Sequence, residues 1–233
     1  MAIYSFIWNG ASSRVMGIRL QAMPEIIRPE ERVNHVTIPG RSGELTITEG
    51  EDIYNSYIQT IPMAVFTPEA VKDAERWLRG SGWVTFCSEP ELKQKARVIN
   101  AVTFKKHGRN SEYWDGDVQF YCDPIKYLIT EEEIEVTSSG TTVANPGDMV
   151  AFPKIAITGS GLITVSAGGK TLTIPNCVSG WVIDSENEWI TQNGIPQVNA
   201  CSGNFPVFNT GNNTVTFTGN VTKLTITPGW RFL

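Results

Sequence analysis

The stretch that most constrains the fold is residues 118–128, VQFYCDPIKYL, because a strand pattern meets a proline there and the sequence changes character afterwards. Val118, Phe120 and Cys122 alternate with more polar residues, which is the period-2 pattern of a strand with one buried face. Since proline cannot donate to a β-ladder, we expect this strand to end at Pro124. The sequence therefore predicts two domains, residues 1–128 and residues 129–233.

The chain has 233 residues, 41% of them hydrophobic and 18% charged, which is typical of a soluble globular protein. No apolar run approaches the roughly 18 residues that a membrane-spanning helix needs, so we expect no membrane insertion. The first ten residues, MAIYSFIWNG, lack a basic region and a cleavage site, which favours a first strand over a signal peptide. We therefore expect synthesis and folding in a reducing cytoplasm.

The net charge is −5 and lies mainly in the second part of the chain. Residues 1–128 hold 15 Lys and Arg against 16 Asp and Glu, whereas residues 129–233 hold 4 against 8. Neither part has the basic excess that usually marks nucleic-acid binding, so we expect no specific nucleic-acid partner.

The cysteines show no C-x-x-C spacing, and only His35 and His107 accompany them, so the sequence predicts neither a metal site nor a cofactor. Free, buried thiols are expected in a reducing compartment. Cys177 with Cys201 is the only pair that we consider for a disulfide. The remaining cysteines are Cys87 and Cys122.

A helix is predicted over residues 68–79. Thr67 can cap it, proline suits its first position, and Gly80 can close it. Its apolar residues recur at helical spacing, and Trp77 and Leu78 should anchor it on a sheet. Strands are expected at residues 3–8, 15–20, 32–38, 54–66, 84–87 and 96–104. One helix against some seven strands predicts a β-sandwich or barrel-like N-terminal domain with one packed α-helix.

Three local features of this first domain carry further expectations. Asn9 and Gly10 form a strong hairpin-turn signal. Pro62 lies inside a long β-prone run and predicts an edge strand or a bulge. Residues 105–116 are expected to form a hairpin loop, whose basic residues Lys105, Lys106 and Arg109 are interpreted as a solvated tip in preference to a phosphate-binding patch.

The loop after the strand at residues 32–38 has two glycines and a proline in five residues, so it can hold a tight, exposed conformation. One interpretation is an ordinary hairpin loop. The other is a subunit-contact loop in which the arginine pairs with a carboxylate of a neighbouring subunit. The loop residues are Pro39, Gly40, Arg41, Ser42 and Gly43.

The second part of the chain reads as short Val/Ile/Thr-rich strands separated by turns, which predicts an antiparallel β-sandwich. Gly168 and Gly169 indicate a two-residue hairpin between strands at 163–166 and 171–174. Gly219 and Asn220 are expected to join two separate strands, at residues 215–218 and 224–227. Further strands are expected at 154–158, 181–184 and 189–191.

Two sets of residues in the second part could support other functions. Asp184, Glu186 and Glu188 alternate and, if extended, would share one face as in a glycosidase or a calcium site, but D-S-E-N-E is also a good turn sequence. No Ser/His/Asp set is credible either, so we expect no enzyme. The tryptophans could stack on sugars, although sandwich cores commonly bury such residues. They are Trp181, Trp189 and Trp230.

Taken in order, several short motifs resemble the distal tail protein (Dit) of long-tailed bacteriophages over almost the whole chain. They are Asn9-Gly10, the loop Ile38-Pro39-Gly40-Arg41-Ser42-Gly43, Trp77-Leu78, Phe120-x-Cys122-Asp123-Pro124, Asn145-Pro146-Gly147, Phe152-Pro153-x-Ile155, Ile183-Asp184-Ser185, Gly203-x-Phe205-Pro206 and Gly211-Asn212-Asn213.

The resemblance implies an N-terminal domain that closes into a hexameric ring, possible pairing of rings back to back, and a galectin-like C-terminal sandwich. It also implies a virion protein at the distal end of the tail, assembled in the host cytoplasm. The implied partners are the tail tube protein, a tail-tip or hub protein and, as a further candidate, the tape-measure protein. The short C-terminal part leaves no room for an inserted sugar module. The alternative is a carbohydrate-binding module that recognises a host glycan.

Overall fold

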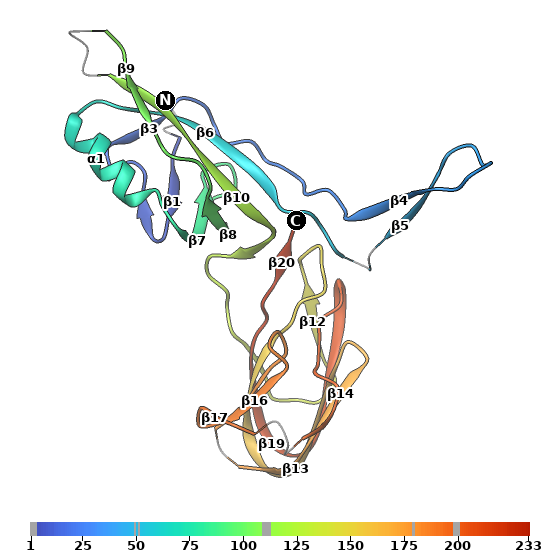
Figure 1. Ribbon diagram of the computed structural model, residues 1–233. Coiled ribbons are helices and arrows are strands. Elements are labelled where there is room, and N and C mark those ends of the chain that lie inside the picture. Colours follow the sequence, from blue (N-terminus) through green and yellow to red (C-terminus); the bar gives the residue numbers. More distant parts are fainter. Residues whose placement is uncertain (1–3, 49, 51, 109–112, 179, 198–200) are drawn as a thin grey trace. The chain divides into compact units, whose positions relative to one another are not determined.

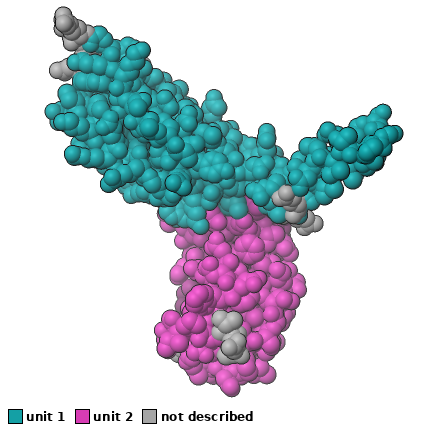
Figure 2. Space-filling model, viewed as in Figure 1, with its two compact units in different colours: residues 1–126, 233 teal, residues 127–232 magenta. Residues whose placement is uncertain are grey.

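The computed structural model describes residues 4–233 except 49, 51, 109–112, 179 and 198–200. The chain divides into two compact units, residues 1–126 with Leu233 and residues 127–232, which Figure 2 shows in two colours. The division falls two residues before the expected one. No helix in the described residues is long and apolar enough to cross a membrane.

Unit 1 contains a curled antiparallel sheet in the order β2-β1-β7-β8-β10-β6-β3, with β9 also pairing to β10 (Figure 1). A fold that is mainly β with one packed helix is confirmed. The strands are β1 (Phe6–Trp8), β2 (Ala11–Ser12), β3 (Ile18–Leu20), β6 (Tyr57–Val65), β7 (Ser81–Phe86), β8 (Leu92–Val98), β9 (Phe104–Lys106) and β10 (Trp114–Leu128).

The expected end of the strand at Pro124 is wrong, because β10 runs through the proline to Leu128. Its ladder with β6 extends from Trp114, opposite Val65, to Cys122, opposite Tyr57. Pro124 lies beyond that ladder, so its missing N–H removes no hydrogen bond from it.

The strand expected over residues 96–104 is also wrong, because β8 ends at Val98 and β9 begins at Phe104. Asn100 lies in the gap, and its side chain takes the place of a backbone pairing with β10. Its amide nitrogen donates to Asp117 O at 3.0 Å, and its Oδ1 accepts from Gln119 N at 2.8 Å. Such side-chain bonds compete with a ladder and interrupt the strand locally.

Pro62 lies on β6, between β10 and β3. Toward β10 the register is continuous at the position opposite Asp117, so there is no bulge on that side. Toward β3 the ladder covers only Met63–Val65, and Gln21 N donates to Pro62 O at 3.0 Å just beyond it. The proline therefore occupies the end of a ladder, where its missing donor matters least.

Helix α1 (Pro68–Trp77) begins where the sequence predicts and ends two residues earlier. The Thr67 hydroxyl accepts a hydrogen bond from Ala70 N at 3.2 Å, which caps the helix. The Trp77 ring stacks on Phe6 with 5.6 Å between centroids and 7° between planes, and Leu78 is buried in the same core. These contacts hold the helix against the sheet.

Unit 2 is built around two long strands, β13 (Lys154–Ala167) and β19 (Gly211–Thr227), which pair with each other along most of their length. The first half of β13 also pairs with β15 and the second half with β14. The ladder shifts register near Gly159, where the two halves meet. The two halves thus belong to different layers of a sandwich, as predicted. The other strands are β11 (Ile134–Val136), β12 (Thr141–Asn145), β14 (Lys170–Cys177), β15 (Trp181–Asp184), β16 (Trp189–Gln192), β17 (Ile195–Pro196), β18 (Ser202–Gly203) and β20 (Arg231–Phe232).

Gly219 and Asn220 do not join two separate strands, because β19 passes through them without a turn. Gly219 has φ +93°, and a Cβ there would lie 2.1 Å from Leu162 O of the neighbouring strand. The glycine therefore permits a close backbone approach where the strand bends from one layer to the other. By contrast, Gly168 and Gly169, with φ +60° and +76°, form the expected hairpin turn.

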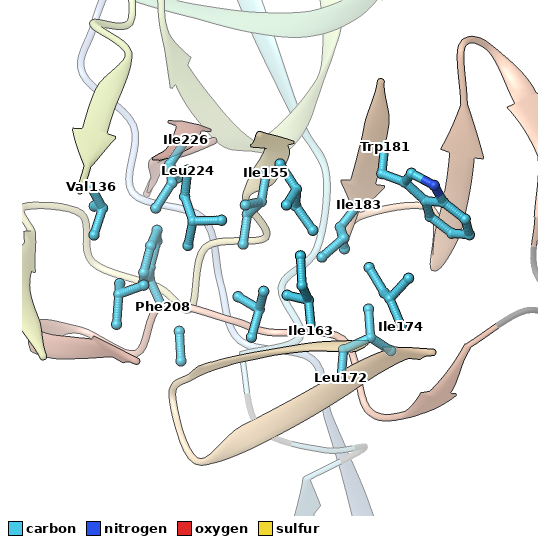
Figure 3. Close-up of a cluster of buried hydrophobic side chains, with 14 of the residues drawn as sticks. Val136, Ile155, Ile163, Leu172, Ile174, Trp181, Ile183, Phe208, Leu224 and Ile226 are labelled. Carbon is cyan, nitrogen blue, oxygen red and sulfur yellow. The ribbon is translucent and has the colours of Figure 1, made fainter. Parts of the chain in front are cut away.

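The core of unit 2 lies between the two layers of this sandwich. Figure 3 shows aliphatic side chains from β13, β14, β15 and β19 converging on one another, with Phe208 and Trp181 at the margins of the cluster. Ile155, Ile163 and Leu172 are almost completely buried. Their burial supplies the main driving force for folding this unit.

Candidate subunit-contact surfaces

Residues 33–48 form a hairpin, which we call the arm. Its strands β4 (Val33–Thr37) and β5 (Glu44–Thr48) pair with each other and make a two-stranded sheet of their own (Figure 1). The predicted loop at residues 39–43 is its tip, where Gly40 and Gly43 have φ +80° and +84° and Arg41 N donates to Ile38 O. The arm therefore presents Arg41 at an exposed turn.

The base of the arm is held by hydrogen bonds between its two ends. Arg32 N donates to Ile53 O at 2.9 Å, and Asn55 N donates to Glu30 O at 2.8 Å. The Arg32 guanidinium also donates to the Asn55 side chain at 3.2 Å. These bonds keep the two ends of the arm together.

The arm has one apolar and one polar face. Val36 lies opposite Leu45, and Ile47 lies opposite Asn34, so these side chains point to the same side of the ribbon. Ile38 extends the same row by two residues. The four aliphatic side chains are between 36% and 46% exposed. The other face carries Val33, His35, Thr37, Glu44, Thr46 and Thr48, so it is mainly polar.

A two-stranded ribbon of this kind is only marginally stable in water by itself. In the described residues no arm side chain is fully buried. An exposed row of aliphatic side chains on such a ribbon is typical of a surface that a partner covers. The arm is therefore the strongest candidate for an intermolecular contact.

The outer surface of the unit 1 sheet, opposite its core, forms a second candidate, which we call the open face. Trp83 lies directly across from Lys95, and Tyr121 across from Ile58. Lys93 and Lys95 lie 5.4 and 5.7 Å from the centre of the Trp83 ring. A shallow hollow of about 410 Å³ separates Trp83 from Tyr121. The open face comprises Ile58, Trp83, Lys93, Lys95, Arg97, Asp117, Tyr121 and Asp123.

The hollow is lined by residues of β7, β8 and β10, among them Gly82, Trp83 and Tyr121. Asn9 fixes this region, because its Oδ1 accepts from Trp83 N at 3.0 Å and its own N–H donates to Trp83 O at 2.9 Å. The Asn9-Gly10 turn predicted from the sequence is present, with φ +48° and +82°. It thereby positions the exposed tryptophan.

The three acidic residues considered for catalysis do not share a face. Asp184 ends β15, and residues 185–188 form a tight turn in which Glu188 has φ +49°. The Asp184 carboxylate accepts from the Asn187 backbone and side chain, and Lys154 Nζ lies 3.0 Å away. Burial alone would raise the pKa of Asp184, but these bonds outweigh it and lower the pKa. The turn interpretation of this sequence is therefore the one that the structure supports.

The tryptophans of unit 2 fall into two classes. Trp181 and Trp230 are buried, whereas Trp189 is 45% exposed. Trp189 borders a hollow of about 280 Å³ together with Lys154, Asp184 and Asn187. Only the Trp189 ring is therefore placed where a sugar could stack on it.

The cysteines and the basic loop show no assembled site in the described residues. Cys87, Cys122 and Cys177 are free, with Cys122 and Cys177 buried, and Cys201 is half-buried like Cys87. Within the same part of the chain no group of three His, Cys, Asp or Glu could hold a metal ion. Lys106 lies over the Trp114 ring at 5.1 Å, and Arg109 is outside the described residues.

The contact surfaces of the arm were only partly visible in the sequence. The glycines predict the tip, but the sequence does not show which face of the arm is apolar, because hydrophobic residues occur at both odd and even positions over residues 33–38. The pairing of β4 with β5 resolves this, since it sets the residues of one strand against those of the other. The open face was missed because Trp83, Lys95 and Tyr121 are far apart in the chain.

Comparison with known proteins gives a result only at the level of structure. No family model matches the sequence, and no curated protein matches it either. Solved structures match, among them the crystal structure of SPP1 Dit (gp 19.1), with a TM-score of 0.77 and 19% identity over 100% of both chains. That protein is described as a paradigm of the hub adsorption apparatus in phages that infect Gram-positive bacteria. The resemblance found in the motifs is thus confirmed for the fold, and the chain has the fold of SPP1 Dit over its full length.

Proposed function

We propose that this chain is a structural protein of a bacteriophage tail, in which six copies form a hub ring. The ring joins the distal end of the tail tube to the tip or baseplate proteins that adsorb to the host. The shared fold with a hub adsorption protein supports this function. The main observation that supports a ring is the arm, because its exposed row of aliphatic side chains is typical of a surface that a partner covers.

A ring is the closed assembly that such an arm favours. An arm on one side of a subunit and a receiving surface elsewhere make a heterologous contact, and repetition of that contact closes into a ring when the rotation allows it. The proposed partners are further copies of the chain, the tail tube protein and a tip protein, with the tape-measure protein as a further candidate. The proposed site of action is the virion, after assembly in the host cytoplasm.

We further propose that unit 2 is a galectin-like sandwich with an adaptor role and that the chain is not an enzyme. The support is the turn at residues 184–188, where the hydrogen bonds of Asp184 serve the local backbone. If the wild-type chain hydrolysed cell-wall polysaccharide and Glu186→Gln abolished that activity, the proposal that the chain is not an enzyme would be contradicted.

The second candidate function is carbohydrate binding by unit 2, favoured by the exposed Trp189 beside a polar hollow. A glycan-array signal that disappears in Trp189→Ala would support it. Trp181→Ala is not a suitable control, because that residue is buried in the core.

The proposed function is tested by light scattering behind size exclusion, with negative-stain images of the peak. Six chains of 25.7 kDa give about 154 kDa, and the images should show rings with a central hole. A chain that remains monomeric at every concentration, and that is absent from purified tails, would contradict the proposal.

A further inference from the structure

We propose that a hollow beside helix α1 is the docking site for an acidic segment of a second tail protein. The hollow has a volume of about 840 Å³, and we call it the arginine hollow. This inference rests on the proposed hub function, because it names a surface through which the ring holds another protein of the tail. The main lining residues of the arginine hollow are Arg14, Val15, Gly17, Arg19 and Phe66.

The turn between β2 and β3, which forms one wall of the hollow, is held in place by buried hydrogen bonds. Ser13 is fully buried, its hydroxyl accepts from Phe6 N at 3.2 Å, and its own N–H donates to Phe6 O at 2.9 Å. Ile18 N donates to Ser13 O at 2.9 Å. At Gly17, with φ +72°, a Cβ would lie 3.0 Å from the Ala70 Cβ of α1, so the turn packs closely on the helix. The turn is therefore ordered before a partner arrives, which lowers the entropic cost of binding.

The arginine hollow carries positive charge without a compensating carboxylate. Arg14 and Arg19 line it, and among the described residues no Asp or Glu does. In the part of the chain that the structure describes, neither guanidinium takes part in a hydrogen bond or an ion pair, and that of Arg19 lies 5.7 Å from the centre of the Phe66 ring. A guanidinium can bind a carboxylate through two parallel hydrogen bonds. An acidic side chain is therefore the partner that this charge favours.

The same hollow exposes apolar side chains to water. Val15 is 82% exposed and Phe66 is 43% exposed, and the Tyr113 ring extends this surface, with its centre 5.5 Å from that of Phe66. Exposed apolar side chains that are grouped in this way are typical of an interaction surface. Because the lining is so open, the hollow does not enclose a small molecule as a ligand pocket does. The partner segment should therefore carry apolar side chains beside its acidic ones.

Other occupants and other surfaces fit less well. Nucleic acid is bound through many phosphate contacts, whereas the hollow offers two arginines on a chain of net charge −5. A sugar would need a free aromatic face, but the Phe66 ring already contacts Arg19, and the exposed ring of Trp189 in unit 2 is better suited to stacking. The open face would repel an acidic segment locally, because Asp117 and Asp123 lie on it.

The first experiment measures, by fluorescence anisotropy, how the full chain binds a short fluorescein-labelled peptide in which glutamate and leucine alternate. A second peptide has glutamine in place of glutamate and tests the role of charge. Arg19→Glu and Val15→Asp alter the hollow. The matched control is Arg76→Glu, which makes the same charge change at a side chain that is 77% exposed in the last turn of α1. Thermal melting checks that each variant is folded.

We expect the Kd of the glutamate peptide to rise about 10-fold or more in Arg19→Glu and in Val15→Asp, because each change places a negative charge where the carboxylate binds. Arg76→Glu should bind like the wild type. The glutamine peptide should bind the wild type about 10-fold or more weakly than the glutamate peptide. Absence of binding by the wild type, equal affinity for the two peptides, or unchanged binding in Arg19→Glu would overturn the inference.

The second experiment labels arginine side chains with phenylglyoxal, first in purified rings of the chain and then in purified tails, and locates the label by mass spectrometry. We expect Arg14 and Arg19 to react in the purified rings and to be protected in the tails, while Arg76 reacts in both. Protection already in the purified rings would show that another copy of the chain covers the hollow, and reaction in the tails would show that nothing covers it. Either result would overturn the inference and leave the proposed function standing. Absence of the chain from the tails would contradict both.

Discussion

The ammonium group of Lys126 lies 2.7 and 2.9 Å from the two carboxylate oxygens of Glu89, and the lysine side chain is only 3% exposed. Leu233 O accepts a third hydrogen bond from the same nitrogen at 3.4 Å. Every ammonium proton therefore has an acceptor. A buried charge that is fully paired in this way makes the two residues depend on each other.

Glu89→Gln should destabilise unit 1 by about 3 kcal/mol, because it leaves a buried ammonium without its counter-charge. Lys126→Met should cost less, about 1–2 kcal/mol, since the Glu89 carboxylate is partly exposed and water can solvate it. Urea unfolding followed by hydrogen exchange of the β10 amides measures both. A larger loss in Lys126→Met than in Glu89→Gln would contradict this account.

Gly219 and Gly211 separate two causes of strain on one strand. Both have positive φ, +93° and +79°, but a Cβ at Gly219 would meet Leu162 O at 2.1 Å, whereas a Cβ at Gly211 would meet nothing within 4 Å. Gly211→Ala should therefore destabilise unit 2 by about 1 kcal/mol through backbone conformation alone. Gly219→Ala should cost about 3 kcal/mol or more, because the bend between the layers must also open. Equal losses of stability in Gly211→Ala and Gly219→Ala, measured by thermal melting, would rule out the contact with Leu162 O as a cause.

Much of the architecture follows from local rules in the sequence. The helix cap at Thr67 and the hairpin at Gly168 and Gly169 obey capping and turn chemistry that acts within a few residues. The errors at Pro124 and Gly219 share one cause, since both were treated as ends of strands. Each strand continues because it pairs with strands that are distant in the sequence. Pro124 therefore lies beyond the end of a ladder and Gly219 lies at a bend, and neither residue ends its strand.

The candidate contact surfaces could be predicted only in part for the same reason. The tip of the arm is local, and its glycines are visible in sequence. The open face depends on register between β7 and β8 and between β6 and β10, which brings Trp83 to Lys95 and Tyr121 to Ile58. No periodicity within one segment encodes that juxtaposition.

Cys122 should make unit 1 sensitive to alkaline pH. Burial raises the pKa of its thiol from the ordinary value of 9 to about 12, and the carboxylate of Asp123 adds to the effect. Because the unfolded chain loses this proton first, the stability is complete below pH 9 and falls between pH 9 and 12, by at most about 1.4 kcal/mol per pH unit. Cys122→Val removes the thiol, so the urea midpoint of unfolding should fall less between pH 9 and 12 in this variant than in the wild type. An unchanged profile in that variant would refute the assignment.

Arg41 should be required for ring assembly because it lies at the tip of the arm, where the guanidinium is available to a carboxylate of the next subunit. Arg41→Glu reverses the charge and should lower the fraction of chain in the ring peak, while Arg41→Lys keeps the charge and should lower it less, since a point charge replaces a two-pronged donor. The matched control is Arg28→Glu, which makes the same charge change at an exposed residue outside the arm and should leave assembly as in the wild type. If Arg41→Glu forms rings as well as Arg28→Glu does, then the tip makes no ionic contact in the ring, and the prediction is wrong.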